Sequence, residues 1–570
     1  MKKAIPVLIA VALILLVGGF YAGQQLLEKY SYSSERADAA EYFGVRDDAD
    51  VPILMAHELI EAHARFFDGH CYMTAADVDA ILCSRFYAGE ADQMLIYTMP
   101  TEMVYTRIGE KTWESTDGSS GTLDCPIARM ENDTLYIALD YVQRFANFDY
   151  MLYRDPNRML LFTEWVPEKR APVNKDTSVR VRGGVKSEIL TDLEKGDQVE
   201  ILEELENWSK VQTEDGFIGY VENKRLSDPI EYQRLQSNPV EIPEYTSISK
   251  PYQINMVWHL IAGKSGNSTV ESLVAATNAG TEGGLNTISP TWFCLSDDEG
   301  GITSFAEEGY VNFAHSKGLE VWGMVDNFTG EGDGVKVLAH LTYRKALIDA
   351  LIDEAQRVGL DGINVDFEAV PSSSGEDFIE FIRELSIACR KNKLVLSVDN
   401  YVPMGSLNDH YDRAEQGVVA DYVIVMGYDE HYKGSPEAGS VASIGYVEDG
   451  IRRTVAEVPA SKVIGGMPFY TRVWATSNGE IDSSALGMAD AAQWVKDRGL
   501  TLTWDETTCQ NYGEFKEKDG TLRQIWMEDA ESIRTKVTVM ETYDIAGVAA
   551  WQLGYETPDV WDVITAAMKK

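Results

Sequence analysis

Eight short apolar runs set the expected architecture of the C-terminal half of the chain. They cover residues 254–258, 287–292, 320–325, 362–367, 394–398, 422–426, 463–468 and 547–551. Most gaps between the runs carry apolar residues at helical spacing, as in 343–358 and 377–391. Buried strands that alternate with helices are typical of a parallel sheet with both faces covered. We therefore predict a closed TIM (β/α)8 barrel over residues 251–570.

The N-terminal half has a different pattern, in which short β-branched alternations are separated by Gly and Asp turns. In residues 170–228 these alternations predict a small all-β barrel. Residues 51–168 mix strands with an amphipathic segment and predict a small α+β module. Residues 26–50 are polar and charged, so we expect a stalk there, and the Pro-containing stretch 229–250 is expected to be a linker. The fold class is therefore α/β, with accessory domains ahead of the barrel.

A long apolar segment opens the chain. Lys2 and Lys3 precede an almost unbroken apolar run from Ala4 to Gly23, which is long enough to cross a bilayer as a helix. No clear small-x-small cleavage site follows the run, and the charge before it predicts that the bulk of the chain is exported. We favour an uncleaved transmembrane signal-anchor over residues 1–25, with a cleaved signal of a secreted protein as the alternative.

Composition narrows the choice of partners. The formal net charge of −41 would repel nucleic acid and anionic membrane surfaces, but it places no restriction on a neutral glycan. The six cysteines show no CxxC spacing, so we expect buried thiols, and any disulfide pairing stays open. His259, His410 and His431 lie near strand ends without an HExxH motif or a histidine cluster. We expect neither a metal nor an organic cofactor.

The strongest chemical signal lies on the fourth predicted strand, Asp361-Gly-Ile-Asn-Val-Asp-Phe-Glu368. Alternate residues of a strand point to the same side, so Asn364, Asp366 and Glu368 should project together into the barrel mouth. Polar groups in a buried strand are costly unless they are paired or used, and active sites of such barrels lie at the C-terminal strand ends. The alternative is a layer of polar side chains that hydrogen-bond one another inside the barrel and have no catalytic role. The combination of Asn364, Asp366 and Glu368 favours an active site over this alternative.

This motif resembles the DGxDxDxE signature of glycoside hydrolase family 18, which includes chitinases and related N-acetylglucosaminidases. The resemblance implies a retaining, substrate-assisted mechanism, the exception to the two-carboxylate scheme. By that resemblance, Glu368 protonates the glycosidic oxygen and then serves as the base for water, while the 2-acetamido oxygen of the substrate is the nucleophile. Asp366 would orient the acetamido group and stabilise the charge on its nitrogen.

Asn364 departs from the family pattern, which has an aspartate at this position. Two nearby carboxylates share a proton, which raises one of their pKa values, and a neutral amide would remove that repulsion. The amide could still hydrogen-bond Asp366 and hold its orientation. We therefore expect one carboxylate fewer around Asp366, and the effect on the pH profile stays open. Asn at this position is familiar in the branch that resembles spore-cortex and cell-wall N-acetylglucosaminidases.

Other strand ends fit the same resemblance. At the sixth strand Tyr428 would hydrogen-bond the acetamido group, and Met426 and Asp429 would line the reacting subsite. At the eighth strand Trp551 would form the hydrophobic floor under the sugar, since an aromatic face stacks on the C–H face of a pyranose. Trp292, on the second strand, is a weaker candidate for substrate binding, with packing as the alternative. The segments 289–293, 426–432 and 525–529 resemble the cell-wall branch more than chitinases.

The accessory regions carry resemblances of their own. Residues 173–226, with Ser178-Val-Arg-Val-Arg182, Trp208 and a closing Gly-Tyr220-Val, resemble a bacterial SH3 domain, a module that often docks on cell-wall peptides or glycans. Trp208 and Tyr220 could equally be core residues. Residues 133–163 weakly resemble the N-terminal module of copper amine oxidases, without metal ligands, and suggest a spacer or binding module.

Together these features predict an extracytoplasmic β-N-acetylglucosaminidase that hydrolyses an N-acetylglucosamine-containing polysaccharide, with peptidoglycan as the leading substrate. The N-terminal helix would hold it at the membrane, and the SH3-like domain would bind the cell wall. A chitinase is the runner-up. Outside enzymes, the alternative is a catalytically silent glycan-binding protein, although such proteins usually lose the glutamate that is present here as Glu368. Endo or exo action, the ligand of the 51–168 module and the oligomeric state stay open.

Overall fold

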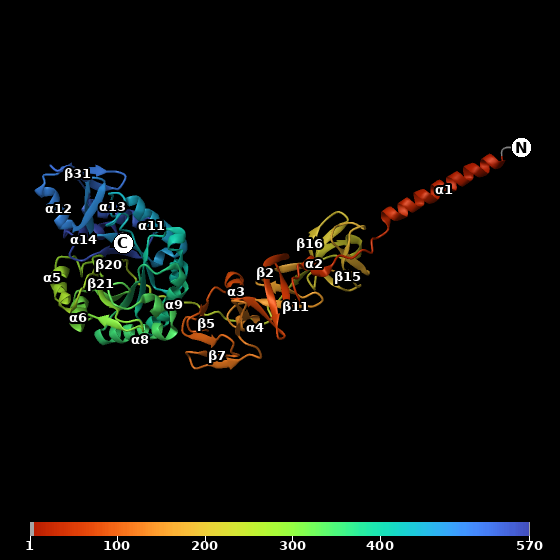
Figure 1. Ribbon diagram of the computed structural model, residues 1–570, viewed down its shortest axis with the longest axis horizontal. Helices are drawn as coiled ribbons and strands as arrows, with labels where there is room; N and C mark the ends of the chain where they lie inside the picture. The colour runs from red at the N-terminus through yellow and green to blue at the C-terminus, as the bar shows by residue number, and fades with distance from the viewer. Residues whose placement is uncertain (1–4, 569–570) are drawn as a thin grey trace. The chain divides into compact units, whose positions relative to one another are not determined.

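The computed structural model describes residues 5–568, and their contacts divide them into two compact units (Figure 1). The first unit holds the accessory regions and comprises residues up to 86, 106–113 and 121–242. The second unit holds the barrel and comprises residues 87–105, 114–120 and those from 243 onwards. Lys2 and Lys3, on which the expected orientation of the N-terminus rests, lie outside the described residues.

A single long helix begins the first unit. This helix, α1, runs from Ile5 to Tyr30, and its apolar side chains are exposed: Ile14, Leu15 and Leu16 have exposed fractions of 69%, 70% and 71%. Within residues 5–568 it is the one helix that is long and apolar enough to cross a membrane. A signal sequence would have the same length and composition, so the helix agrees with both an anchor and a signal.

The SH3-like barrel is a seven-stranded sheet in the order β15-β14-β18-β17-β16-β13-β19. Its strands are β13 (Pro167–Pro172), β14 (Thr177–Arg180), β15 (Ile189–Leu193), β16 (Gln198–Glu204), β17 (Trp208–Thr213), β18 (Ile218–Glu222) and β19 (Ile230–Gln233). Its buried core includes Val179, Val211 and Val221, whereas Trp208 and Tyr220 are only half-buried. The last strand lies in the segment that we expected to be a linker.

The segment expected to be a stalk is part of this barrel. Helix α2 (Ala39–Phe43) follows α1, and Phe43 is 2% exposed in the barrel core, with its ring centroid 4.8 Å from that of Phe217. The backbone N–H of Ala37 donates to the carbonyl of Ile189 at 3.0 Å. The stalk expectation therefore fails for this stretch, because a polar composition does not reveal one aromatic side chain that fills a neighbouring core.

The α+β module is built on a second seven-stranded sheet, in the order β11-β12-β1-β2-β3-β10-β9. Its strands are β1 (Asp50–Met55), β2 (Glu58–Phe67), β3 (His70–Thr74), β9 (Ala128–Glu131), β10 (Thr134–Ala138), β11 (Asp149–Tyr153) and β12 (Arg158–Phe162). Two short helices, α3 (Ala75–Ile81) and α4 (Leu139–Val142), accompany it. The amphipathic segment expected within this module thus yields in α4 only a single helical turn, which β11 follows.

A five-stranded sheet in the order β4-β5-β6-β7-β8 interrupts the module. Its strands are β4 (Phe86–Gly89), β5 (Met94–Thr98), β6 (Met103–Arg107), β7 (Thr112–Ser115) and β8 (Ser120–Thr122). Residues 87–105 belong to the barrel unit, where the hydroxyl of buried Tyr87 donates to Asp377 at 2.6 Å. Asp92 lies 2.9 Å from the ring of His340 and accepts the backbone N–H of Leu341 at 2.7 Å. The sequence pattern did not indicate these contacts, because they join residues far apart in the chain.

All eight predicted barrel strands are present. They are β20 (Ile254–His259), β21 (Thr287–Leu295), β23 (Glu320–Asp326), β24 (Gly362–Asp366), β25 (Val395–Tyr401), β26 (Tyr422–Met426), β27 (Val463–Pro468) and β33 (Gly547–Trp551). They pair in parallel, and the pairing of β20 with both β21 and β33 closes the sheet, with β22 (Ile302–Ser304) as an antiparallel extension. The predicted TIM barrel is confirmed.

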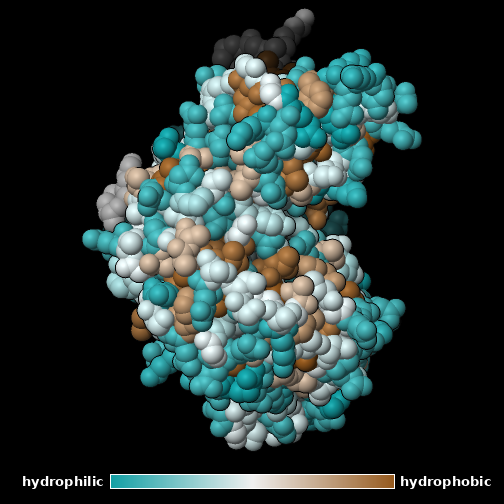
Figure 2. Space-filling view, turned by 90° about the vertical axis from the view of Figure 1, so that its left-hand side faces the viewer, coloured by the Kyte–Doolittle hydropathy of each residue, from teal (hydrophilic) through white to brown (hydrophobic). Residues whose placement is uncertain are grey.

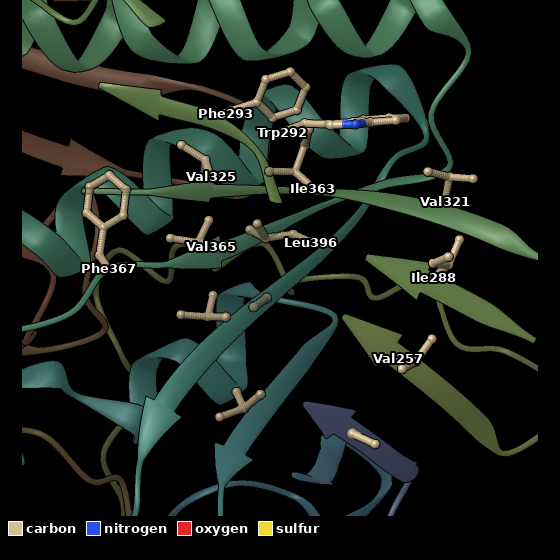
Figure 3. Close-up of a cluster of buried hydrophobic side chains, with 14 of the residues drawn as sticks. Val257, Ile288, Trp292, Phe293, Val321, Val325, Ile363, Val365, Phe367 and Leu396 are labelled. Atoms are coloured by element: carbon tan, nitrogen blue, oxygen red, sulfur yellow. The ribbon is translucent and has the colours of Figure 1, made fainter. Parts of the chain in front are cut away.

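Helices surround the barrel. They are α5 (Val270–Val274), α6 (Glu308–Ser316), α7 (Gly334–Ala339), α8 (Leu341–Val358), α9 (Gly375–Asn392), α10 (Arg413–Val419), α11 (Ile444–Glu457), α13 (Ala530–Glu541) and α14 (Asp559–Ala567). Figure 3 shows the apolar layer between strands and helices, to which β24 and the residue after it contribute Ile363, Val365 and Phe367. These three are at most 1% exposed. The alternation predicted for the fourth strand therefore holds, and its polar residues face the barrel interior.

An insertion separates the seventh and eighth barrel strands. It is a five-stranded antiparallel sheet of β28 (Tyr470–Ser477), β29 (Glu480–Gly487), β30 (Thr503–Asp505), β31 (Gln510–Lys516) and β32 (Leu522–Trp526), accompanied by α12 (Met488–Asp497). It explains the long gap between the last two apolar runs.

Figure 2, which views the barrel unit, shows a mostly hydrophilic surface with small hydrophobic patches, as expected when the apolar strand residues are buried.

Candidate active site

A cavity of about 460 Å³ lies at the C-terminal ends of the barrel strands, where active sites of such barrels are found. The predicted site residues that line it are Trp292, Asp366, Glu368, Met426, Tyr428, Asp429 and Trp551. Asn364 lies deeper on β24 and is fully buried. The structure thus brings the predicted side chains together at one end of the barrel.

Glu368 follows the end of β24 and is held at both its backbone and its side chain. Its backbone N–H donates to Oδ1 of Asn327 at 2.8 Å, and Nδ2 of Asn327 donates back to its carbonyl at 2.9 Å. The hydroxyl of Tyr401 donates to Oε2 of Glu368 at 2.7 Å. Burial raises the pKa of Glu368; the bond from Tyr401 lowers it, and the charges of Asp429 and Asp326 raise it further. A carboxyl group with a raised pKa in a cavity is suited to general acid catalysis.

Asp366 is the most strongly perturbed carboxyl group of the cavity wall. It is 5% exposed, and burial raises its pKa well above the ordinary value, with further increases from the charges of Asp399, Glu368 and Asp326. Its Oδ1 atom has no hydrogen-bond partner within residues 5–568. Because a buried polar atom without a partner is costly, this oxygen is available to accept a hydrogen bond from a ligand in the cavity.

Asn364 makes four hydrogen bonds inside the barrel. Its Oδ1 accepts from the indole N–H of Trp258 at 2.9 Å and from the hydroxyl of Ser289 at 3.1 Å. Its Nδ2 donates to the hydroxyl of Ser397 at 3.0 Å and to Oδ1 of Asp399 at 2.8 Å. These bonds fix the orientation of the amide, because the indole N–H can only donate.

The expectation of one carboxylate fewer around Asp366 needs correction. In the described part of the chain the side chain of Asn364 bonds Asp399 and not Asp366. Asp399, on the neighbouring strand β25, is 2% exposed and raises the pKa of Asp366 through its charge. A buried carboxyl group therefore lies beside Asp366 after all, supplied by the next strand instead of its own.

Aromatic rings form much of the remaining wall. The ring of Tyr428 contacts Trp258 edge-on, with 6.4 Å between centroids, and Tyr470 in the same manner at 6.4 Å. The ring centroid of Trp551 lies 6.2 Å from that of Trp258. The hydroxyl of Tyr470 donates to Oδ1 of Asp429 at 2.6 Å, which holds that carboxylate at the rim. A wall of aromatic rings with a few fixed polar groups suits the mixed surface of a sugar.

Trp292 differs from the other predicted binding residues. Although it borders the cavity, its side chain is 0% exposed and its indole N–H donates to Asn267 at 2.8 Å. Its ring packs edge-on against Tyr310, with 4.8 Å between centroids. Met426, by comparison, is 8% exposed at the end of β26. The burial of Trp292 supports the packing alternative, because its ring has no exposed face to offer a ligand.

Four residues of the site were not anticipated: Asp326, Asp399, Tyr401 and Tyr470. The first three stand at the C-terminal ends of β23 and β25, so applying the strand-end rule to every predicted strand would have found them. Tyr470 comes from the insertion, for which the sequence showed no pattern.

The histidines have structural contacts. His259 is buried, with its ring nitrogens 2.9 Å from the Tyr310 hydroxyl and 3.1 Å from that of Thr269. Burial lowers the pKa of His259 to about 4, so the ring is neutral at physiological pH. Across residues 5–568 no group of three or more His, Cys, Asp or Glu side chains is arranged to hold a metal ion.

Comparison with protein families agrees with the domain readings. Residues 316–556 match the family model of glycosyl hydrolases family 18, and residues 175–227 match that of the bacterial SH3 domain. Both resemblances drawn from the sequence are thereby confirmed. The weak resemblance of residues 133–163 to the copper amine oxidase module stays a prediction.

Curated relatives match up to about half of the chain. The uncharacterized glycosylase YvbX of Bacillus subtilis (strain 168) is 28% identical over 299 residues, which cover 50% of this chain and 85% of that protein. The cortical fragment-lytic enzyme of the same organism is 25% identical over 227 residues, which cover 39% of this chain and only 52% of that enzyme. The crystal structure of the Bacillus cereus spore cortex-lytic enzyme SleL has a TM-score of 0.50 and 19% identity, covering 59% of this chain and 78% of that chain, and this likeness shows the fold alone.

Proposed function

We propose that the barrel of this chain, a glycoside hydrolase family 18 domain related to spore cortex-lytic enzymes and chitinases, is a retaining β-N-acetylglucosaminidase that acts on peptidoglycan. One observation carries the proposal. Glu368 presents a carboxyl group with a raised pKa to the cavity, while Asp366, two residues earlier at the end of β24, is almost completely buried. The Glu368 acid is thus exposed to the substrate. The burial of Asp366 suits a role in orienting the acetamido group of the substrate more than attack on the anomeric carbon.

The carboxylates support substrate assistance because those other than Glu368 are poorly suited to act as a nucleophile. Asp366 has a raised pKa and is buried. Asp326 accepts hydrogen bonds from the backbone and hydroxyl groups of Thr329 at 2.7 and 2.8 Å, and Asp429 accepts one from Tyr470. When no free carboxylate faces the anomeric carbon, the acetamido oxygen of the substrate is the available nucleophile, as in the substrate-assisted exception to the two-carboxylate scheme.

The proposed reaction proceeds in two steps. Glu368 donates its proton to the glycosidic oxygen while the acetamido oxygen attacks the anomeric carbon. The bond between that carbon and the glycosidic oxygen breaks, the leaving sugar departs as an alcohol, and an oxazolinium intermediate remains. Asp366 accepts a hydrogen bond from the acetamido N–H, with Tyr428 bordering the same pocket. Glu368, now ionised, then removes a proton from the attacking water, which opens the oxazolinium ring with net retention. Trp551 stacks against the sugar ring throughout.

Three observations support peptidoglycan as the substrate. Relatives of the chain carry names that refer to spore cortex, such as the cortical fragment-lytic enzyme. The chain also has a bacterial SH3 domain, which we propose binds the cell wall, and an N-terminal apolar helix, which we propose anchors an extracytoplasmic enzyme in the membrane. Chitin is the alternative substrate, because the class V chitinase of Arabidopsis thaliana is 26% identical over 267 residues. A silent glycan-binding protein is less well supported, since Glu368 is present and held in the cavity.

A paired digest tests the proposal. Purified peptidoglycan and chitin oligomers are each incubated with wild type, with Glu368→Gln and with a control, Glu308→Gln, which changes an exposed glutamate of α6 outside the cavity. We expect new N-acetylglucosamine reducing ends from peptidoglycan with wild type and control, and a rate reduced roughly 10²- to 10⁴-fold by Glu368→Gln. Faster release of reducing ends from chitin oligomers than from peptidoglycan would make chitin the preferred substrate. Equal inactivity of wild type and Glu368→Gln on both substrates would contradict the hydrolase proposal.

A further inference from the structure

Strands β24 and β25 present three successive pairs of polar side chains to the barrel interior. The pairing register sets Asn364 opposite Ser397, and continuing it in steps of two residues sets Asp366 beside Asp399 and then Glu368 beside Tyr401. The first and third pairs are hydrogen-bonded, at 3.0 Å for Asn364 and Ser397 and at 2.7 Å for Glu368 and Tyr401. The middle pair consists of two carboxyl groups.

Each carboxyl group of the middle pair has one oxygen without a partner. Oδ1 of Asp366 and Oδ2 of Asp399 make no hydrogen bond within residues 5–568, and the two residues are 5% and 2% exposed. Two adjacent buried carboxylates cannot both be ionised without a large electrostatic and desolvation cost. A single proton held by the pair would satisfy one of these oxygens and remove one of the charges.

Asn364 cannot take up that proton, but it fixes the group that can. Its Nδ2 donates to Oδ1 of Asp399 at 2.8 Å, which leaves Oδ2 of Asp399 as the oxygen free to hold a proton. The opposite end of the amide is held by Trp258 and Ser289. The amide therefore orients Asp399 on the β25 side of Asp366.

We propose that Asp399 is the positioning residue that holds the proton shared with Asp366 and so leaves Asp366 ionised when the acetamido group of the substrate enters the cavity. This rests on the proposed function. In this step the carboxyl group of Asp366 gives its proton to the carboxylate of Asp399. One proton moves between two oxygens and no other bond changes. Asp366 then accepts the acetamido N–H, and Asp399 never contacts the substrate.

The charges around the pair agree with this role. Burial, followed by the charge of Glu368, raises the pKa of Asp399 to about 8, although the bond from Asn364 opposes the increase. The other titratable groups facing the pair are Asp326 on β23, Tyr428 after β26 and the buried Tyr411 before α10, and Tyr401 lies one pair farther along β25. The cavity lining, as described, includes no lysine or arginine that would favour two ionised carboxylates.

Moving the carboxyl group from one strand to the other tests the proposal. We would measure kcat, KM and the pH profile of kcat for wild type, Asp399→Asn and the exchange Asn364→Asp with Asp399→Asn. Asp399→Asn should lower kcat at least roughly tenfold with little change in KM, since it affects proton placement more than sugar binding. The acid limb of the profile should move to higher pH, because Asp366, whose pKa is raised chiefly by burial, must then lose its proton to solvent instead of passing it to Asp399. The exchange variant keeps the number of buried carboxyl groups and should recover most of kcat and the wild-type profile.

Two results would overturn the proposal: an unchanged kcat and pH profile in Asp399→Asn, or an exchange variant no more active than Asp399→Asn. Either would show that Asp399 acts through its packing alone. A wild type without activity on any glycan would contradict the proposed function instead. In that case the pair is tested by the number of protons that the protein takes up on folding between pH 5 and pH 8. This number should be smaller in Asp399→Asn than in wild type, and an equal number would overturn the proposal of a shared proton.

Discussion

The hydroxyl of Tyr401 donates a hydrogen bond to Oε2 of Glu368 at 2.7 Å and accepts one from the backbone N–H of Ala369 at 3.3 Å. A single side chain on β25 therefore holds the carboxyl group of the proposed general acid and the backbone that follows it. The bond also lowers the pKa of Glu368, against the effect of burial.

Tyr401→Phe should raise the pKa of Glu368, because the donor that stabilises its ionised form is lost. Glu368 must be protonated to act as the acid, so the alkaline limb of kcat/KM should move to higher pH, by less than about one pH unit for the loss of one hydrogen bond. A pH profile of kcat/KM between pH 4 and pH 9 measures this shift. A limb that stays in place, or one that moves to lower pH, would show that the bond does not control Glu368.

The two tryptophans that border the cavity should respond differently to truncation. Trp551→Ala removes a half-buried ring that we expect to stack on the sugar, so KM should rise, by roughly tenfold, with little change in the free energy of unfolding. Trp292→Ala removes a fully buried ring and should instead lower the free energy of unfolding by about 3–5 kcal/mol. Steady-state kinetics and denaturant titration on both variants separate the two roles. The same pattern in both variants would contradict the assignment.

Much of the fold follows from the sequence because its signals are local. Each barrel strand is an apolar run bounded by helical segments, and the period of two within the fourth strand places Asp366 and Glu368 on one side. What could not be predicted depends on contacts distant in sequence. Phe43 fills the core of a barrel whose strands come more than a hundred residues later, and Tyr87 contacts Asp377 across 290 residues.

The site shows the same division. Residues on one strand with Glu368 were found from spacing, whereas Asp399 and Tyr401 become its neighbours only through the pairing of β24 with β25. Asn364 suggested a missing carboxylate because its own strand was considered alone. The neighbouring strand supplies the carboxyl group, and no single-strand pattern can reveal such an exchange.

The buried acids should make the barrel less stable as the pH rises. The pKa of Asp399 is about 8 in the folded chain against an ordinary 3.8. Its contribution to the free energy of unfolding is therefore fully present below about pH 4 and is lost as the pH rises to 8. Glu384 and Glu528, each with a pKa raised to about 7 by burial, act in the same direction. We expect a lower free energy of unfolding at pH 8 than at pH 5, and a smaller difference in Asp399→Asn. Denaturant titrations at both pH values test this; an equal difference in the two proteins would contradict the pKa of Asp399.

The stereochemistry of the first product tests the central claim most directly. A ¹H NMR time course of the preferred glycan during the first minutes of digestion shows which anomer of the new reducing end appears before mutarotation. An acetamide-assisted reaction with Glu368 as acid and base predicts that the β-anomer appears first, and that Glu368→Gln gives no signal over the same period. Early appearance of the α-anomer would mean inversion by direct attack of water, and would contradict the mechanism proposed for Glu368 and Asp366.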